Sequence, residues 1–305
     1  MIQDLTFVVI GKNEASNLPR CFSSIKKISQ NIVYVDSDSS DNSIEIAKKF
    51  DIKIILKVKS SYGTPALSRS VGAKKVNTKY IQFVDGDMEL DTNWPTKAIK
   101  RLESNSNIVA VHGYKKVFTH NTDDFFILSD KNDWEADYLQ GAFLINKDSY
   151  IKAGGLDGRF YGEEERDLYI RIKSIGYEVW YIHQLMGSHY DLKKKSITRI
   201  FFSDSCASIW IPLIKAIKAK NVRSYVFVYR ALLLPFLLDI ISIFSIFFGF
   251  KKFIIIGIIL QCIELVYCLS INRKGYFIIW KVAFINLFKA IKIYRRDISY
   301  NVETF

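Results

Sequence analysis

Short apolar runs rich in β-branched residues alternate with helix-like segments through the first half of the chain. The runs are LTFVVI at 5–10, NIVYVD at 31–36, IKIILKV at 52–58 and YIQFVD at 80–85. Helices are predicted between them, near 17–28, 42–50 and 64–76. The last helix has a clear start, with Thr64 as its N-cap and Pro65 at its first position. This alternation predicts an α/β domain with a largely parallel sheet.

A polar cluster accompanies the end of three of these predicted strands. GKNE follows the first strand, DSDSSD begins at the end of the second, and DGDMELD begins at the end of the fourth. In α/β sheets of this kind, ligands bind outside the carboxyl ends of the strands, where the strand order reverses. We therefore expect the binding site at this edge of the sheet.

The cluster at the end of the fourth strand suits a divalent cation. Asp85 and Asp87 repel each other when nothing lies between them, and Gly86 allows a turn that directs both carboxylates at one ligand. Carboxylate oxygens on a short loop are suitable ligands for Mn²⁺ or Mg²⁺. A solvated turn is the alternative for this motif taken alone, so the other clusters have to decide between the two interpretations.

The formal net charge of +12 is not spread evenly over the 305 residues. Residues 193–305 contain 18 Lys and Arg against 5 Asp and Glu, whereas residues 1–192 contain 25 against 26. The sequence has no helix-turn-helix pattern, zinc-finger spacing or aromatic RNA-binding strand, so we expect no nucleic-acid partner. The four cysteines form no CxxC motif and are predicted to be reduced and structural.

The basic last third also contains the longest apolar runs, Ala231–Phe250 and Phe253–Ile271. Each run approaches the length of about 20 helical residues that crosses a bilayer. Basic residues beside such runs favour anionic membrane lipid as a partner. The predicted organisation is a first domain at 1–192, a basic juxtamembrane connector at 193–224, an apolar helical pair at 225–272 and an amphipathic basic tail at 273–305.

Charges inside and around the apolar pair bear on how it meets the membrane. Asp239 and Glu264 interrupt the two runs, so the helices are either transmembrane or re-entrant. Helices buried in a dimer core are the soluble alternative. The N-terminus carries Asp4 and too short an apolar stretch for a signal peptide. Because Lys and Arg flank the pair, we expect the cytoplasmic membrane as the location, with the first domain facing the cytoplasm.

Five segments in this order resemble the motifs of family 2 glycosyltransferases of the GT-A fold, over about residues 4–190. They are FVVIGKNEASNL, VYVDSDSSDNSIEIA, SRSVGAKKVNTKYIQFVDGDMEL, QGAFLINKDSYIKAGGLD and GEEERDLYIRI. The resemblance implies a GT-A fold and an enzyme that uses a nucleoside-diphosphate sugar, with a UDP-sugar favoured. A nucleotidyltransferase is disfavoured because the first strand is followed by no Gly-rich phosphate loop.

The resemblance also implies which residues bind the nucleotide sugar. They are Ile10, Lys12, Glu14, Asp36, Arg69, Asp85 and Gly86. Two departures stand out, because Asp38 replaces the usual glycine after the second strand and Ser70 replaces the usual asparagine after Arg69. Arg69 either approaches the nucleotide or pairs with an acid of the DGD loop. For Asp41 we favour a structural role as the N-cap of the helix at 42–50.

The same resemblance implies the metal ligands and the acceptor side. Asp87 is expected to bind the cation together with His189, with His183 as the competing candidate and an uninvolved surface histidine as the alternative. The acceptor side is expected at Gln140, Gly141 and Ala142.

The segment GEEERDL aligns with the family pattern G-E-D-x-D-L, which implies Glu165 as the catalytic base, with Glu164 or Asp167 as alternatives. The expected reaction is one displacement at the anomeric carbon, with inversion and with a metal-assisted leaving group. A lipid-linked or otherwise membrane-bound hydroxyl acceptor is predicted, in cell-surface polysaccharide synthesis. A polyprenyl-phosphate acceptor and an inactive membrane-tethered nucleotide-sugar-binding protein are the alternatives.

Overall fold

The computed structural model describes residues 1–119, 122–126, 132–191, 210–218 and 287–305, with single residues and pairs between 222 and 266. The chain divides into two compact units. The first comprises Met1–Lys195 and Arg296–Phe305, and the second comprises Ser196–Arg295. All the predicted site residues belong to the first unit.

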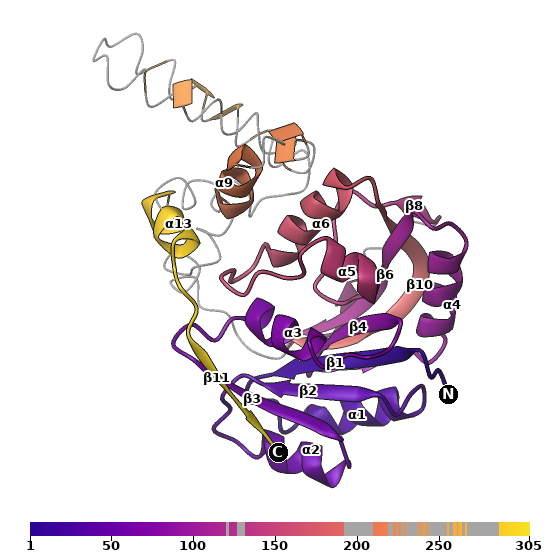
Figure 1. Cartoon of the computed structure of the whole chain (residues 1–305). Helices are drawn as coiled ribbons and strands as arrows, with labels where there is room; N and C mark the ends of the chain where they lie inside the picture. Colours follow the sequence, from indigo (N-terminus) through magenta and orange to yellow (C-terminus); the bar gives the residue numbers. More distant parts are fainter. Residues whose placement is uncertain are drawn as a thin grey trace. The chain divides into compact units, whose positions relative to one another are not determined.

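The first half of the first unit has the alternating order that the sequence predicts (Figure 1). Its elements are β1 (Leu5–Gly11), α1 (Leu18–Lys26), β2 (Ile32–Asp36), α2 (Ser43–Lys49), β3 (Ile54–Ser60), α3 (Pro65–Ala73) and β4 (Tyr80–Asp85). β1 pairs in parallel with β2 and β4, and β2 pairs in parallel with β3. The strand order reverses at β1, which lies between β2 and β4, so the loops after β1 and β4 meet there.

The second half extends the same sheet with mixed pairing. Its elements are β5 (Met88–Leu90), α4 (Trp94–Glu103), β6 (Ile108–Thr119), β7 (Thr122–Phe126), β8 (Trp134–Glu135), β9 (Phe143–Asn146), α5 (Lys147–Lys152), α6 (Glu164–Ser174) and β10 (Glu178–Asp191). β9 is antiparallel to β4 and β6, and β10 is parallel to β6 and antiparallel to β5. With β11 (Tyr300–Thr304) at one edge, the neighbour order is β11-β3-β2-β1-β4-β9-β6-β10-β5. Residues 138–157 contain β9, α5 and a turn in which Gly154 and Gly155 are left-handed.

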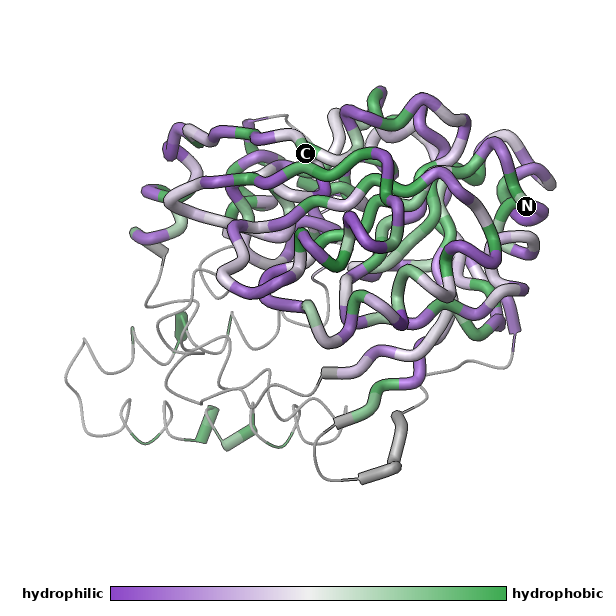
Figure 2. Tube along the Cα trace, turned by 90° about the horizontal axis from the view of Figure 1, so that it is seen from below, coloured by the Kyte–Doolittle hydropathy of each residue, from purple (hydrophilic) through white to green (hydrophobic). Residues whose placement is uncertain are grey.

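Helices cover both faces of the sheet, with α1 and α2 on one side and α3, α5 and α6 on the other (Figure 1). On the first side, Phe7 and Val9 of β1 share a buried core with Leu18 and Phe22 of α1. Burying one such side chain contributes about 1.5–3 kcal/mol relative to leaving it exposed. In Figure 2, hydrophobic stretches run through the interior of this unit, and hydrophilic ones lie mainly at its periphery.

Helix α3 is fixed closely against the sheet and against the loop that precedes α6. A Cβ added to Gly72 would lie 2.5 Å from Val8 Cγ1, so only glycine allows this approach of helix and strand. The predicted N-cap is confirmed, because the Thr64 side chain accepts a hydrogen bond from the Leu67 N–H at 3.0 Å. The Thr64 hydroxyl also donates to the carbonyl oxygen of Gly158 at 2.7 Å. These contacts set the position of Arg69, which the same helix carries.

The C-terminal end includes an edge strand that was not predicted, while the amphipathic tail at 273–305 stays a prediction. Residues 273–286 lie outside the described residues, and α13 (Leu287–Tyr294) buries Ala290 and Ile293 within the second unit. The last residues instead form β11 (Tyr300–Thr304), which pairs antiparallel with β3 in the first unit. Its side chains are mostly exposed, so backbone hydrogen bonds hold this edge strand in place. Its sequence has no hydrophobic periodicity that would predict a strand.

The described part of the last third includes α9 (Trp210–Lys218), which packs against α13. Among the described residues, none of the helices combines the length and the apolar character that crossing a bilayer requires. Most of the predicted apolar pair at 225–272 lies outside those residues. The membrane-associated helices therefore stay a prediction.

Candidate active site

Two carboxylates and one imidazole converge at the carboxyl edge of the sheet. Asp85, Asp87 and His189 each offer a ligand atom, and the three atoms lie within 4.8 Å of one another. Asp85 ends β4 and Asp87 follows it, whereas His189 belongs to β10. The antiparallel pairing of β10 with β5 sets His189 opposite Met88, the residue after Asp87. The sheet therefore assembles the cluster from distant parts of the sequence.

This cluster fits a divalent cation. The Asp87 Oδ1 atom is shielded from solvent and has no hydrogen bond, although His189 Nε2 lies 3.1 Å away. An open carboxylate oxygen beside a second carboxylate and an imidazole is a donor set for Mn²⁺ or Mg²⁺. Although burial lowers it, the neighbouring Asp87 carboxylate raises the pKa of His189 above its usual value. The competing candidate, His183, is exposed and contacts the Tyr114 ring at 5.4 Å, outside this cluster.

Arg69 connects this cluster to the start of α6. Its Nη2 donates to Asp85 Oδ1 at 2.7 Å, and its Nη1 donates to Glu164 Oε1 at 3.0 Å and to Glu165 Oε1 at 3.1 Å. The Arg69 side chain is only 5% exposed, and a buried cation of this kind requires partners. Of the two roles predicted for Arg69, the structure therefore supports pairing with the acid of the DGD loop.

Glu164 and Glu165 differ in burial although they are neighbours in the first turn of α6. The Glu164 side chain is 3% exposed and the Glu165 side chain 16% exposed. Burial, and then the charge of Glu165, raise the pKa of Glu164 well above that of an ordinary carboxyl. Burial also raises the pKa of Glu165, and the Arg69 guanidinium only partly offsets this. Glu165 is therefore the more accessible of two carboxyls that hold protons tightly.

The backbone before α6 takes a left-handed conformation that favours glycine. Gly162 has φ 87° and Glu163 has φ 68°. Glu163 stands where the G-E-D-x-D-L pattern has its glycine, so the turn is kept although the residue differs. Its carboxylate pairs with Arg166 at 2.9 Å. A strained residue at the entrance of a site helix is typical of functional regions, where the surrounding structure holds it in place.

Asp167 was one of the predicted alternatives for the catalytic base, and its surroundings in the structure do not suit that role. Its side chain is 2% exposed and pairs with Arg171 at 2.6 Å, one helical turn later. The same guanidinium donates to the carbonyl oxygens of Ala153 and Gly155. Asp167 therefore orients Arg171 onto the turn after α5 and has no open face toward a substrate.

The predicted acceptor side is partly corrected as well. A Cβ added to Gly141 would lie 3.1 Å from Glu165 Oε1 and 3.4 Å from Arg69 Nη2. The small residue thus makes room for the Glu165–Arg69 pair, and its predicted contact with an acceptor stays a prediction. Ala142 is fully buried in the hydrophobic core and cannot contact an acceptor in this conformation. Gln140 is half-buried at the same segment, with its Nε2 3.5 Å from the Tyr138 hydroxyl.

The predicted nucleotide-binding residues of the first two loops have mixed surroundings. Lys12 is exposed, whereas Asp36 is fully buried and accepts hydrogen bonds from the Tyr34 hydroxyl and the Ser39 N–H. Glu14 is 8% exposed and accepts from the Asn17 side-chain amide at 2.7 Å. Asp38 has φ 61°, so the turn of the family pattern persists without its glycine.

Ile10 and Gly86 join the loops after β1 and β4 through the backbone. The Gly86 N–H donates to the Ile10 carbonyl oxygen at 2.8 Å. A Cβ on Gly86 would lie 3.2 Å from that oxygen. Gly86 and Asp87 form the predicted turn between β4 and β5, and because Gly86 does not have a left-handed φ, it is the close approach to Ile10 that favours glycine there.

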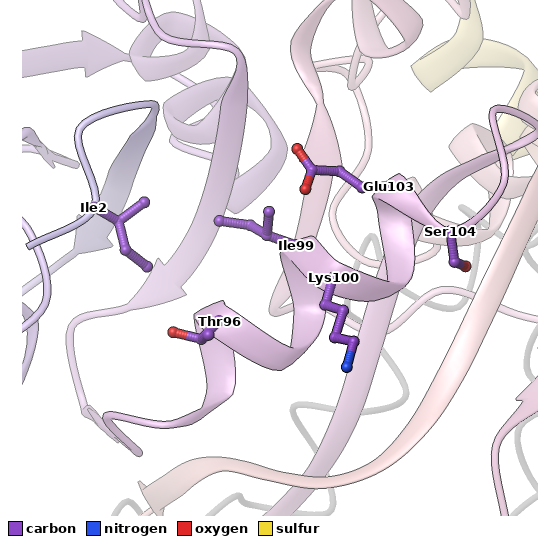
Figure 3. A pocket seen from close by; sticks show the side chains of 6 residues that line it. All are labelled: Ile2, Thr96, Ile99, Lys100, Glu103 and Ser104. Carbon is purple, nitrogen blue, oxygen red and sulfur yellow. The ribbon is translucent and has the colours of Figure 1, made fainter.

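Two cations near the cluster were not predicted. The Arg20 guanidinium lies over the Tyr190 ring at 3.5 Å, next to His189 in the chain. Lys115 belongs to β6, a strand that the sequence pattern did not assign, and its charge lowers the pKa of Asp85. The open hollow in Figure 3, of about 590 Å³, lies elsewhere, and its lining residues are Ile2, Thr96, Ile99, Lys100, Glu103 and Ser104.

The α/β fold of this chain has solved counterparts among glycosyltransferases. One is S. aureus TarS 1-349 in complex with UDP-GlcNAc, with a TM-score of 0.63, 11% identity, and coverage of 94% of this chain and 92% of that one. Another is the mannosyltransferase PcManGT from Pyrobaculum calidifontis in complex with GDP-Man and Mn²⁺, with a TM-score of 0.60, 13% identity, and coverage of 93% and 86%. At these identities the likeness shows the fold, and the predicted GT-A-like α/β fold is confirmed.

The sequence comparison points to the same class of protein. Residues 6–154, just under half of the chain, match the model of glycosyl transferase family 2. An uncharacterized glycosyltransferase of Rickettsia conorii is 28% identical over 91 residues, which are 30% of this chain and 31% of that protein. The match thus spans less than a third of the curated relative. The predicted enzyme class, a glycosyltransferase, is confirmed.

Proposed function

We propose that this protein transfers a sugar from a nucleoside-diphosphate sugar, with a UDP-sugar favoured, to a hydroxyl of a membrane-associated acceptor, with inversion at the anomeric carbon. The observation that carries the proposal is the link between two groups at one edge of the sheet. The Asp85, Asp87 and His189 cluster lies on one side of Arg69, and Glu165 lies on the other. A cation site and a candidate base are thereby held by one buried guanidinium.

The donor side of the proposal rests on the acidic cluster. Asp87 and His189, with Asp85 beside them, would hold Mn²⁺ or Mg²⁺, and the bound cation would neutralise charge on a diphosphate. The solved neighbours bind UDP-GlcNAc in one case and GDP-Man with Mn²⁺ in the other, which supports a nucleotide sugar as the donor class. Asp85 is held by Arg69, whereas Asp87 Oδ1 has no hydrogen bond and lies 3.1 Å from His189 Nε2, so Asp87 and His189 are the pair that would bind a ligand together.

Glu165 is the proposed base. It would take the proton of the acceptor hydroxyl while that oxygen attacks the anomeric carbon and the bond to the diphosphate breaks. Its raised pKa brings the carboxylate closer to the basicity that this proton transfer needs at neutral pH. Glu164, more deeply buried and with its pKa raised further, would hold a proton and help to position Arg69. A single displacement of this kind inverts the configuration.

The acceptor is proposed from the last third of the chain. Its basic residues and the apolar runs at 225–272 support attachment to anionic lipid of the cytoplasmic membrane, with the first unit on the cytoplasmic side. A lipid-linked glycan in cell-surface polysaccharide synthesis would present a sugar hydroxyl there. A polyprenyl phosphate is already ionised and needs no base, so Glu165 favours the hydroxyl over that alternative.

The test is transfer by membranes that contain the full chain. UDP-, GDP- and dTDP-sugars carrying a labelled sugar are supplied with Mn²⁺, with Mg²⁺ or with EDTA. Label should enter the lipid fraction with one donor class, only with metal, and at a rate that Glu165→Gln reduces strongly. Metal-dependent binding of a nucleotide sugar without transfer or hydrolysis would instead identify an inactive binding protein. Transfer that survives EDTA would contradict the metal-dependent mechanism.

A further inference from the structure

Strand β6 brings a lysine to the cation cluster. β6 and β10 run in parallel, with Lys115 opposite Gly187 and Val117 opposite His189. Side chains alternate along a strand, so Lys115 and Val117 project from one face of β6, and His189 projects from that face of β10. Lys115 is thus the diagonal neighbour of His189, and its four methylene groups give it reach along the sheet. Lys116 projects from the opposite face.

No direct contact of its side chain explains the position of Lys115. The residue is half-buried, and among the residues that the structure describes its side chain forms no ion pair and no hydrogen bond. Burial raises the pKa of Asp85, but the charges of Arg69 and then Lys115 lower it below its usual value. The charge of Lys115 therefore reaches the cluster, although Arg69 already pairs with Asp85 and neutralises its charge.

A lysine beside a cation site becomes unfavourable once the cation is bound. Lys115 repels any divalent ion that Asp85, Asp87 and His189 hold, and partial burial weakens its hydration. Local arrangements that oppose stability are expected where function requires them. The arrangement becomes favourable when an anion enters together with the metal, because the anion then lies between two positive groups.

We propose that Lys115 binds a phosphate oxygen of the nucleoside diphosphate and stabilises that group as it leaves. This inference rests on the proposed function. When the bond between the anomeric carbon and the diphosphate oxygen breaks, its electron pair stays on that oxygen. Lys115 stays protonated and contributes charge and a hydrogen bond, not a proton. A phosphate of a lipid acceptor has the same chemistry, but the position beside the cluster favours the donor diphosphate.

The experiment compares Lys115→Met with Lys116→Met in the full chain. Mn²⁺ binding without nucleotide is measured by electron paramagnetic resonance. Binding of UDP, UMP and uridine in saturating Mn²⁺ is measured by calorimetry, with no acceptor present. Lys115→Met should bind UDP about tenfold to a hundredfold more weakly, because a charged hydrogen bond is lost. It should bind uridine normally and Mn²⁺ at least as tightly as the wild type. Lys116→Met should match the wild type, and Lys115→Arg should recover most of the UDP affinity.

The sign of the Mn²⁺ effect separates this role from a structural one. Damage to β6 would weaken Mn²⁺ and UDP binding together, and that result would overturn the inference. Unchanged UDP binding by Lys115→Met would overturn it as well, and would point to an acceptor phosphate if lipid-phosphate transfer alone were lost. A wild type that binds none of UDP, GDP and dTDP in Mn²⁺ would overturn the proposed function, and the inference with it.

Discussion

Two acidic loops at the same edge of the sheet look alike in sequence and differ in structure. The β2 loop, residues 36–41, and the β4 loop, residues 85–87, each begin at the end of a buried parallel strand. In the β2 loop, Asp36 accepts from Tyr34 and Ser39, and Asp41 accepts from the backbone N–H groups of Ala15 and Ser43. In the β4 loop, an Asp87 oxygen lacks any hydrogen bond and faces Asp85 and His189.

The difference lies in whether the protein's own donors occupy the carboxylate oxygens. A carboxylate that accepts backbone N–H groups shapes its loop, as an Asx turn or a helix cap does. Asp41 does this one residue before the cap position of α2, Asn42, close to the predicted N-cap role. A carboxylate with an open, shielded oxygen is able to take a ligand. The β2 loop is therefore expected to govern stability and the β4 loop to govern binding.

Removing the Asp87 charge should have the largest effect. Asp87→Asn should abolish detectable metal-dependent turnover, because metal assistance is worth several kcal/mol in such a step. Its melting temperature should change little, since the relief of the repulsion from Asp85 offsets the loss of the ion pair with His189. Turnover, Mn²⁺ titration and thermal unfolding measure the three quantities. Near-normal turnover in a folded variant would remove the β4 loop from the mechanism.

Glu165→Gln should lower the turnover number by about 10²–10⁴-fold, the usual contribution of a general base. UDP and Mn²⁺ binding should stay close to wild type, because Glu165 is not in the cation cluster. Glu164→Gln is the matched control, since it alters the neighbouring carboxyl with the same Arg69 contact. A larger loss in Glu164→Gln than in Glu165→Gln would transfer the role of base to Glu164.

The pH dependence of turnover should reflect the raised pKa of Glu165. The base acts in its unprotonated form, so activity is present above that pKa and falls as the pH drops through it. The fall should therefore begin above the range of an ordinary glutamate, about pH 4.3. A pH profile of the turnover number at saturating substrates measures this. A rate that stays constant down to the ordinary carboxyl range would contradict the assignment.

Much of the fold was predictable because it depends on local patterns. The alternation of apolar runs and helices and the Thr64 cap follow from neighbouring residues. Asp85 and Asp87 were found for the same reason, as a compact motif at a strand end. The i,i+4 spacing of Asp167 and Arg171 is also a local signal, since it indicates an ion pair on one helix face. The alignment with the family motif led instead to Asp167 as an alternative catalytic base.

The rest depends on pairings between distant segments. His189 reaches Asp87 through the β10 and β5 pairing, and residue periodicity cannot supply that register; the family resemblance suggested it. Lys115 lies on a strand that was not assigned, and its neighbours were therefore unknown. Gly141 was expected to admit a sugar, but the packing of Glu165 and Arg69 against it became visible only in three dimensions.

A smaller effect, on stability rather than turnover, is expected in the β2 loop. Asp36→Asn should lower the free energy of unfolding by about 1–3 kcal/mol, because a buried amide cannot satisfy both the Tyr34 hydroxyl and the Ser39 N–H as acceptor. Mn²⁺ affinity should not change. Chemical denaturation and Mn²⁺ titration test the two statements. Lost UDP binding at unchanged stability would instead return Asp36 to its predicted role in nucleotide binding.

The smallest effect should come from Asp38→Gly, which restores the usual glycine of the family pattern. Asp38 has φ 61°, and glycine adopts this conformation without strain, so the variant should gain about 0.5–1 kcal/mol in stability. The partly exposed ion pair with Lys57 that it loses contributes less than about 1 kcal/mol.

Asp51→Gly is the matched control for this change. Asp51 also has a positive φ, 50°, and a lysine partner, Lys53, but it lies outside the site. Both variants should keep wild-type turnover, measured beside chemical denaturation. If Asp38→Gly alone lost turnover, a carboxylate of the β2 loop would be acting on a ligand, and the contrast between a structural and a binding loop would fail.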